Sequence, residues 1–249
     1  MDYINEKKIK GHGNPISFKD LRKLEEKSDN SMCKIEYKGN IGTAFFFRQN
    51  ISSIKYYNKI FLITNSHVLE SNFFKHYNEL PINYKNKEKI ILLNNRIKIM
   101  NEELDYCIIE IKEEDEIKDY FLIDNLILDK ENGNQYLNND TYISQFPEGR
   151  DLSFAQGEIK SIKNDTIKHS IPTLHGSSGS PILIQNNNIF KIIGIHKAEC
   201  RNDNYNLGIY MKCVLNDIND KNISQNNYNN INDKFILKDK HKIQVKNVI

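Results

Sequence analysis

Short apolar segments separated by polar turns fill most of the chain after its first 30 residues. Isoleucine, phenylalanine, tyrosine and valine dominate these segments, and each one is too short to be a core helix. Many short strands with turn residues between them are typical of sandwiches and barrels, so the pattern predicts an all-β protein. The predicted strands are 33–37, 41–48, 58–64, 88–93, 106–112, 141–146, 155–162, 165–170, 181–185 and 189–195.

A polar extension, residues 1–32, precedes these strands. Ser17 can cap a helix there, because its hydroxyl accepts a hydrogen bond from a backbone N–H of the first helical turn. Phe18, Leu21 and Leu24 then recur at a spacing of three, which predicts one short helix in the extension.

Two further polar stretches divide and end the chain. Residues 116–140 are acidic and rich in asparagine, and we expect them to connect two β halves of similar length, at 33–115 and 141–215. Residues 216–249 are polar and then basic, which predicts a C-terminal helix followed by a tail.

The overall composition excludes several classes of partner. The 249 residues carry a net charge of +2, which is too small to indicate a nucleic-acid-binding protein. No apolar run is long enough to span a membrane, and the first residues lack the apolar core of a secretion signal. We therefore expect an intracellular, cytoplasmic protein without nucleic-acid or membrane partners.

The four cysteines are scattered along the chain, which fits a reducing compartment better than a disulfide framework. His196, Cys200 and Cys213 have a spacing that permits a metal site in principle, but they lack the paired ligands of zinc sites. We therefore expect no metal and no cofactor.

The strongest chemical signal is a glycine- and serine-rich turn, Gly176-Ser177-Ser178-Gly179-Ser180-Pro181. A serine between glycines in a tight turn presents its hydroxyl as a nucleophile, and Gly179 gives the turn its conformational freedom. The backbone N–H groups of Gly176 and Ser178 are expected to form an oxyanion hole for a tetrahedral intermediate. The spacing selects Ser178 as the nucleophile, because Gly176 precedes it by two residues and Gly179 follows it.

Two upstream residues supply the groups that such a serine needs. His67 lies in a short polar turn after an apolar strand, and an imidazole is the usual base that removes a proton from a serine hydroxyl near pH 7. Asp105 stands at the entrance of an almost wholly apolar strand, where an unpaired carboxylate would be costly. A hydrogen bond from the ring of His67 would satisfy Asp105 and fix the tautomer of the imidazole.

Together, Thr64-Asn65-Ser66-His67, Asp105 before its strand, and the serine turn resemble the chymotrypsin-like serine peptidases, in their His–Asp–Ser order. The resemblance spans roughly residues 33–215 and includes the segments 41–47 and 208–212. The serine turn is most similar to that of bacterial glutamyl endopeptidases and related intracellular trypsin-like domains. The resemblance implies two six-stranded antiparallel β-barrels with short terminal helices, and a serine endopeptidase that works through an acyl-enzyme.

The same resemblance places the pocket for the side chain before the scissile bond at Thr173 and at the strand that contains His196. In glutamyl endopeptidases a histidine and a small hydroxyl residue at these positions bind a glutamate carboxylate, which implies a preference for acidic residues. Glu199 stands where these enzymes usually have glycine, and a carboxylate there repels an acidic side chain or favours a basic one. Lys197 can neutralise Glu199, and His196 can also be a strand residue without a role in the pocket.

The expected partner is therefore a protein or peptide substrate, and the sequence names no regulatory partner. An alternative is a catalytically silent protease-fold module that binds extended peptides by strand addition. The complete set of His67, Asp105 and Ser178 favours the enzyme.

Overall fold

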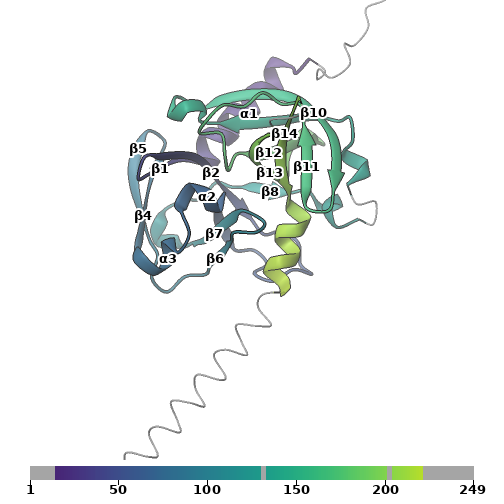
Figure 1. The fold of residues 1–249 in the computed structure, drawn as a ribbon. Helices are drawn as coiled ribbons and strands as arrows, with labels where there is room; N and C mark the ends of the chain where they lie inside the picture. The colour runs from purple at the N-terminus through teal and green to yellow at the C-terminus, as the bar shows by residue number, and fades with distance from the viewer. Residues whose placement is uncertain (1–14, 130–132, 201–203, 221–249) are drawn as a thin grey trace, which may run out of the picture.

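The C-terminal half of the chain closes into a six-stranded antiparallel barrel (Figure 1). Its strands pair in the order β9–β10–β11–β14–β13–β12, and β12 pairs again with β9, which closes the ring. Isoleucine side chains from these strands fill the interior. The strands are β9 (Asp140–Gln145), β10 (Ser153–Lys163), β11 (Thr166–His169), β12 (Pro181–Asn186), β13 (Ile189–Cys200) and β14 (Tyr205–Tyr210).

The structure is a computed structural model that describes residues 15–129, 133–200 and 204–220. Its N-terminal half is an antiparallel sheet in the order β5–β4–β1–β2–β3–β7–β6, with its own apolar core. Among the described strands no ladder joins β5 to β6, so the second closed barrel expected from the sequence is not confirmed. The strands are β1 (Met32–Tyr37), β2 (Asn40–Arg48), β3 (Ile60–Thr64), β4 (Glu79–Tyr84), β5 (Lys87–Leu92), β6 (Lys98–Asn101) and β7 (Tyr106–Ile111).

A short strand, β8 (Phe121–Ile123), joins the two halves. It pairs in parallel with β2 on one side and with β13 on the other. The sequence analysis expected only antiparallel pairing, and these two parallel pairs differ from that expectation. Phe121 and Ile123 are fully buried and Leu122 is not, which is the alternation of a strand packed on one face. The stretch expected to be only a connection therefore contributes to the sheet.

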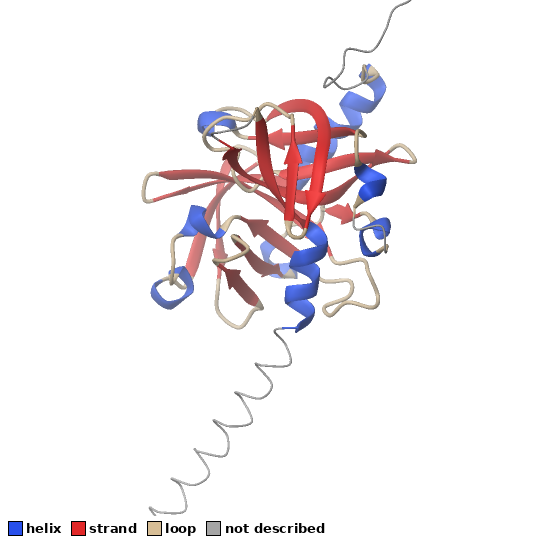
Figure 2. Cartoon of the chain, turned by 45° about the vertical axis from the view of Figure 1, so that its right-hand side comes forward, coloured by secondary structure: helices blue, strands red, loops and turns tan. Residues whose placement is uncertain are grey.

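Helices lie around the strands rather than between them (Figure 2). Helix α1 (Phe18–Ser31) begins as predicted, with the Ser17 hydroxyl accepting a hydrogen bond from the backbone N–H of Asp20 at 3.0 Å. It runs as far as Ser31 because Leu24 enters the core and Ser28 bonds to Ser144 of β9. Two one-turn helices, α2 (Ser66–Leu69) and α3 (Phe73–His76), follow β3.

A last helix spans 211–220, and the predicted tail beyond residue 220 lies outside the described residues. No helix in the described part of the chain is long and apolar enough to cross a membrane. The domain boundaries proposed from the sequence, at 33–115 and 141–215, stay a prediction.

Four strands are missing from the list predicted by the apolar pattern: β4, β6, β8 and β14. Of these, β14 is represented in the sequence analysis only by the segment 208–212 of the family resemblance. In β4, Leu80 and Ile82 alternate with polar residues and Pro81 interrupts the run, which obscured the strand signal. The proline is tolerated because the register of β4 against β1 consists of a single pair, Lys34 opposite Asn83. Strands β6 and β8 are four and three residues long, too short for a periodic pattern.

Asp124, directly after β8, fastens this strand to the barrel. Its carboxylate is fully buried and accepts hydrogen bonds from the Tyr136 hydroxyl at 2.7 Å and from the Lys191 ammonium at 3.3 Å. Its backbone N–H donates to the carbonyl of Ile192 in β13 at 3.0 Å. A buried carboxylate is tolerated only when its oxygens are paired in this way.

We predict that Tyr136→Phe lowers the free energy of unfolding by about 1–3 kcal/mol, because it leaves a buried carboxylate oxygen without its hydroxyl donor. Urea denaturation followed by circular dichroism measures this loss. The matched control is Tyr142→Phe, since the Tyr142 hydroxyl has no hydrogen-bond partner in the described part of the chain and its ring is equally buried. Equal losses in the two variants would contradict the role assigned to Asp124.

Candidate active site

His67 and Asp105 meet because they follow and precede two paired strands. Strands β3 and β7 are antiparallel neighbours, with Thr64 opposite Cys107, so the end of β3 lies beside the start of β7. The ring Nδ1 of His67 lies 2.9 Å from Oδ2 and 3.0 Å from Oδ1 of Asp105. The structure thus brings these two predicted residues into direct contact.

The carboxylate of Asp105 is buried and accepts several hydrogen bonds. Besides the ring of His67, its Oδ1 atom accepts from the Ser66 hydroxyl at 2.8 Å and from the backbone N–H of His67 at 3.1 Å. Burial raises the pKa of Asp105, but the hydrogen bonds from His67 and Ser66 outweigh it and hold this pKa below its usual value. Asp105 is therefore ionised at neutral pH, and the Nδ1–H of His67 points at it, which leaves Nε2 as the basic atom.

The serine turn is clamped against β2 by a threonine. Thr43 donates its backbone N–H to the carbonyl of Ser178 at 2.8 Å and its hydroxyl to the carbonyl of Gly176 at 2.8 Å. Gly179 passes so close to this strand that a Cβ atom there would lie 2.0 Å from the carbonyl oxygen of Thr43. The turn also needs a φ of +89° at Gly179 and +86° at Gly176, a region that favours glycine.

Two backbone N–H groups of this turn have no acceptor within the described residues: those of Gly176 and Ser178. The amides around them are used, because Ser177 donates to Leu174, Gly179 to His196 and Ser180 to Ser177. Two free donors in one glycine turn form a site that can bind a negatively charged oxygen. These are the two residues that the sequence predicts for the oxyanion hole.

The hydroxyl of Ser178 donates to the carbonyl oxygen of Lys197 at 3.2 Å. Over the described chain no hydrogen bond joins it to His67. The ammonium of Lys197 in turn lies 3.8 Å from Oδ2 of Asp105, so one residue of β13 contacts both other parts of the site. Catalytic hydrogen bonds are often long or poorly aligned before substrate binds. The missing hydrogen bond between Ser178 and His67 is therefore compatible with Ser178 acting together with His67 and Asp105.

The predicted pocket residues occupy different environments. His196 is almost fully buried, Thr173 is half-buried, and Glu199 is exposed. The ion pair that the described structure gives Lys197 is with Asp105, so the alternative that Lys197 neutralises Glu199 is not supported.

His196 belongs to a chain of hydrogen bonds inside the barrel. Its Nδ1 atom lies 3.3 Å from Nε2 of His169, whose Nδ1 accepts from the backbone N–H of Ile171 at 3.3 Å. The ring of His196 also bonds to the carbonyl of Leu207. Each bond can be satisfied with both rings uncharged, if His169 donates to His196 and His196 donates to Leu207.

Burial, together with repulsion from the charge of His67, lowers the pKa of His196 to about 3. Burial, with repulsion from His196, also places the pKa of His169 well below its usual value. Both rings are therefore neutral at pH 7.

The sequence analysis did not assign three residues to the catalytic site that contact it in the structure: Thr43, Ser66 and Lys197. Ser66 had a local signal, because it stands next to His67 in a polar turn. Thr43 had no such signal, and Lys197 was considered only as a partner of Glu199, since each reaches the site through contacts between distant segments. No group of three or more histidine, cysteine, aspartate or glutamate side chains that could hold a metal ion occurs in the ranges described.

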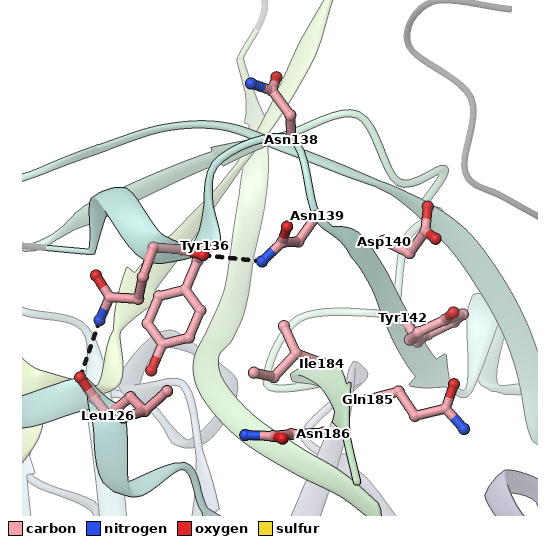
Figure 3. A pocket seen from close by; sticks show the side chains of 10 residues that line it. Leu126, Tyr136, Asn138, Asn139, Asp140, Tyr142, Ile184, Gln185 and Asn186 are labelled. Carbon is pink, nitrogen blue, oxygen red and sulfur yellow. Dashed lines mark hydrogen bonds between the residues drawn. The ribbon is translucent and has the colours of Figure 1, made fainter. Parts of the chain in front are cut away.

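The hollow shown in Figure 3 lies away from these residues. It has a volume of about 440 Å³ and is lined by the segment before β9, the start of β9 and the end of β12, including Tyr136, Asn139, Asp140 and Gln185. The serine turn instead precedes β12, and the N–H of Phe146 after β9 bonds to Thr43 beside that turn. The hollow and the candidate site therefore lie at opposite ends of the same two strands.

Comparison with known proteins gives a consistent family. The sequence profile of the trypsin-like peptidase domain matches residues 42–195. No curated protein sequence matches the chain.

Several solved protease structures share the fold. The active form of the Rv3671c protease from M. tuberculosis superposes with a TM-score of 0.55 at 13% identity, over 84% of this chain and 88% of that one. A Glu endopeptidase in complex with MPD gives 0.54 at 17% identity, over 77% and 89%. Deg5 gives 0.57 at 13% identity, over 81% and 94%. At these identities the likeness establishes the fold alone.

The buried histidines predict how stability depends on pH. Because the pKa of His196 is about 3 in the folded chain and near 6.5 when unfolded, the unfolded chain binds more protons between these values. The free energy of unfolding should therefore rise with pH up to about 6.5, and His196→Gln should reduce that slope by about 1.4 kcal/mol per pH unit between pH 4 and 6. Urea titrations at several pH values measure the slope.

The matched control for this slope is His76→Gln, because His76 is exposed at the end of α3. That variant should keep the slope of the parent chain. A slope that His196→Gln leaves unchanged would show that the histidine is not held neutral in the folded chain.

Proposed function

The chain belongs to the trypsin-like peptidase domain family, and on this premise we propose that it is a serine endopeptidase whose catalytic triad is Ser178, His67 and Asp105. The observation that carries the proposal is that the N–H groups of Gly176 and Ser178, on the same turn as the serine hydroxyl, have no acceptor in the described parts of the chain. The contact between His67 and the buried Asp105 supports it, since this pair supplies an oriented base.

In the proposed reaction the Ser178 hydroxyl leaves the Lys197 carbonyl and turns to Nε2 of His67. His67 takes its proton while Oγ attacks the carbonyl carbon of the peptide bond, and the oxygen of that carbonyl becomes an anion. The N–H groups of Gly176 and Ser178 stabilise the anion, and Asp105 stabilises the imidazolium. His67 then protonates the leaving amine, and an acyl-enzyme remains that water hydrolyses by the same steps.

A second candidate function is a silent module that binds extended peptides without cleaving them. One observation favours it: the Ser178 hydroxyl bonds to the Lys197 carbonyl rather than to His67. In this candidate Ser178 would stay fixed to β13, and a peptide would be held by strand addition alone.

A fluorophosphonate probe tests the two candidates directly. We expect covalent labelling of the chain at pH 7–8 and its loss in Ser178→Ala, because the probe reacts only with an activated serine hydroxyl beside an oxyanion hole. Intact-protein mass spectrometry measures the adduct. Ser180→Ala is the matched control and should leave labelling unchanged, since the Ser180 hydroxyl is buried in the same turn and has no hydrogen-bond partner among the described residues. A folded parent chain that is never labelled favours the silent module.

For substrate preference, we infer an acidic residue before the scissile bond, bound by Thr173 and His196. A carboxylate accepts strong hydrogen bonds from a hydroxyl and from an imidazole N–H, even when the imidazole is neutral. An acidic side chain reaches the His196 N–H only if the ring gives up its bond to Leu207. The competing preference for a basic residue rests on Glu199, which is exposed and free to face a substrate cation.

Peptides that vary only before the scissile bond separate these preferences. We expect faster cleavage after glutamate than after lysine, and a roughly tenfold lower kcat/KM for glutamate in Thr173→Val, because a hydrogen bond to a charged group is lost. Glu199→Gln should raise kcat/KM for cleavage after glutamate, since it removes a charge of the same sign as the substrate side chain. Preferential cleavage after lysine or arginine would contradict this inference and would indicate that Glu199 binds the substrate side chain.

A further inference from the structure

Lys197 occupies an irregular position in β13. Its neighbours His196 and Ala198 pair with the consecutive residues Gly208 and Leu207 of β14, so Lys197 is the extra residue of a β-bulge. A bulge leaves a residue outside the regular ladder and redirects its side chain. This irregularity frees the Lys197 carbonyl to accept the hydroxyl of Ser178.

The redirected side chain ends beside the charge at the centre of the site. Its ammonium lies 3.8 Å from Oδ2 of Asp105, the oxygen that is also 2.9 Å from Nδ1 of His67. The side chain is 38% exposed, so its charge is only partly screened by water. Asp105 therefore has two cationic partners in reach when His67 is protonated.

The surroundings of this carboxylate are otherwise neutral donors. Ser66 donates its hydroxyl and His67 its backbone N–H. The charge of His67 also interacts with His196, which is buried and uncharged near pH 7. Lys197 is thus the permanent positive charge next to the His67–Asp105 pair among the described residues.

A permanent cation at this place has a definite effect on the base. It repels the imidazolium form of His67, and it neutralises part of the Asp105 charge that would stabilise that form. Both effects favour the uncharged imidazole, which is the form that can take a proton from a serine hydroxyl.

Resting on the proposed function, we propose that Lys197 is a positioning residue: its ammonium holds the Asp105 carboxylate as a second counter-ion and extends to lower pH the range in which His67 is an uncharged base. Lys197 acts through Asp105 and touches no reacting atom with its side chain. Its backbone carbonyl holds the Ser178 hydroxyl until the serine turns to His67, so one bulge residue contacts both ends of the triad.

The test is an NMR titration of the His67 ring in the full chain, with the signal assigned by comparison with His67→Gln. In Lys197→Met the pKa of His67 should rise by roughly 0.5–1 unit, because the repelling charge is gone. The pH midpoint of the fluorophosphonate labelling rate should shift upwards by the same amount. Lys197→Arg keeps the charge and should restore the parent value.

Lys163→Met is the matched control, because it removes one exposed positive charge from the end of β10. It should leave the His67 titration unchanged. An unchanged pKa of His67 in folded Lys197→Met, or an equal rise in Lys163→Met, overturns the proposal. The titration does not need a reactive serine, so a chain that is never labelled would refute the peptidase while still measuring the effect of Lys197.

Discussion

The buried carboxylate of Asp105 is the charge on which the candidate site depends. Taking a carboxylate out of water costs several kcal/mol unless donors replace the water, and here the donors come from both halves of the molecule. Ser66 and His67 belong to α2, the one-turn helix after β3, whereas Lys197 belongs to β13 of the barrel. The site is therefore complete only when the N-terminal sheet and the barrel are docked.

Docking of the halves also fixes the serine turn. Thr43 of β2 satisfies the carbonyls of Gly176 and Ser178 and receives the N–H of Phe146. The two N–H groups without an acceptor among the described residues belong to the peptide groups that begin at His175 and Ser177. The carbonyls of those two peptide groups accept the backbone N–H groups of Glu148 and Ser180, so neither group can flip without losing a hydrogen bond, and the two N–H groups keep one direction. Preorganised donors of this kind need no rearrangement when negative charge develops.

A separate set of contacts holds the halves together at the other side of the barrel. Strand β8 pairs with both β2 and β13, and Asp124 after it is bonded to Tyr136 and Lys191. These contacts lie far from the serine turn along the strands, so the docking of the two halves has support that does not involve the reacting groups. The site can then be tuned by single residues such as Lys197 without altering the fold.

Local sequence was sufficient to identify much of this protein. The all-β class, most strands, the cap of α1 and the family follow from periodicity and from motifs a few residues long, because these report the conformation of the chain around each residue. The contact of His67 with Asp105 was predicted from the chemistry of a carboxylate at a buried strand entrance. The pattern could not reveal β8, which is a strand only because two other strands flank it.

By itself, the sequence determined which residues can do chemistry: a base, a carboxylate and a serine in a glycine turn, in a fixed order along the chain. Tertiary structure alone decided what surrounds them. It turned Lys197 towards Asp105 rather than Glu199, through a bulge that depends on the pairing of β13 with β14. It also set Thr43 beneath the serine turn and left the barrel as the only closed ring among the described strands. The physical reason is that hydrogen bonds between distant segments form only when the sheet closes, and no local pattern encodes that closure.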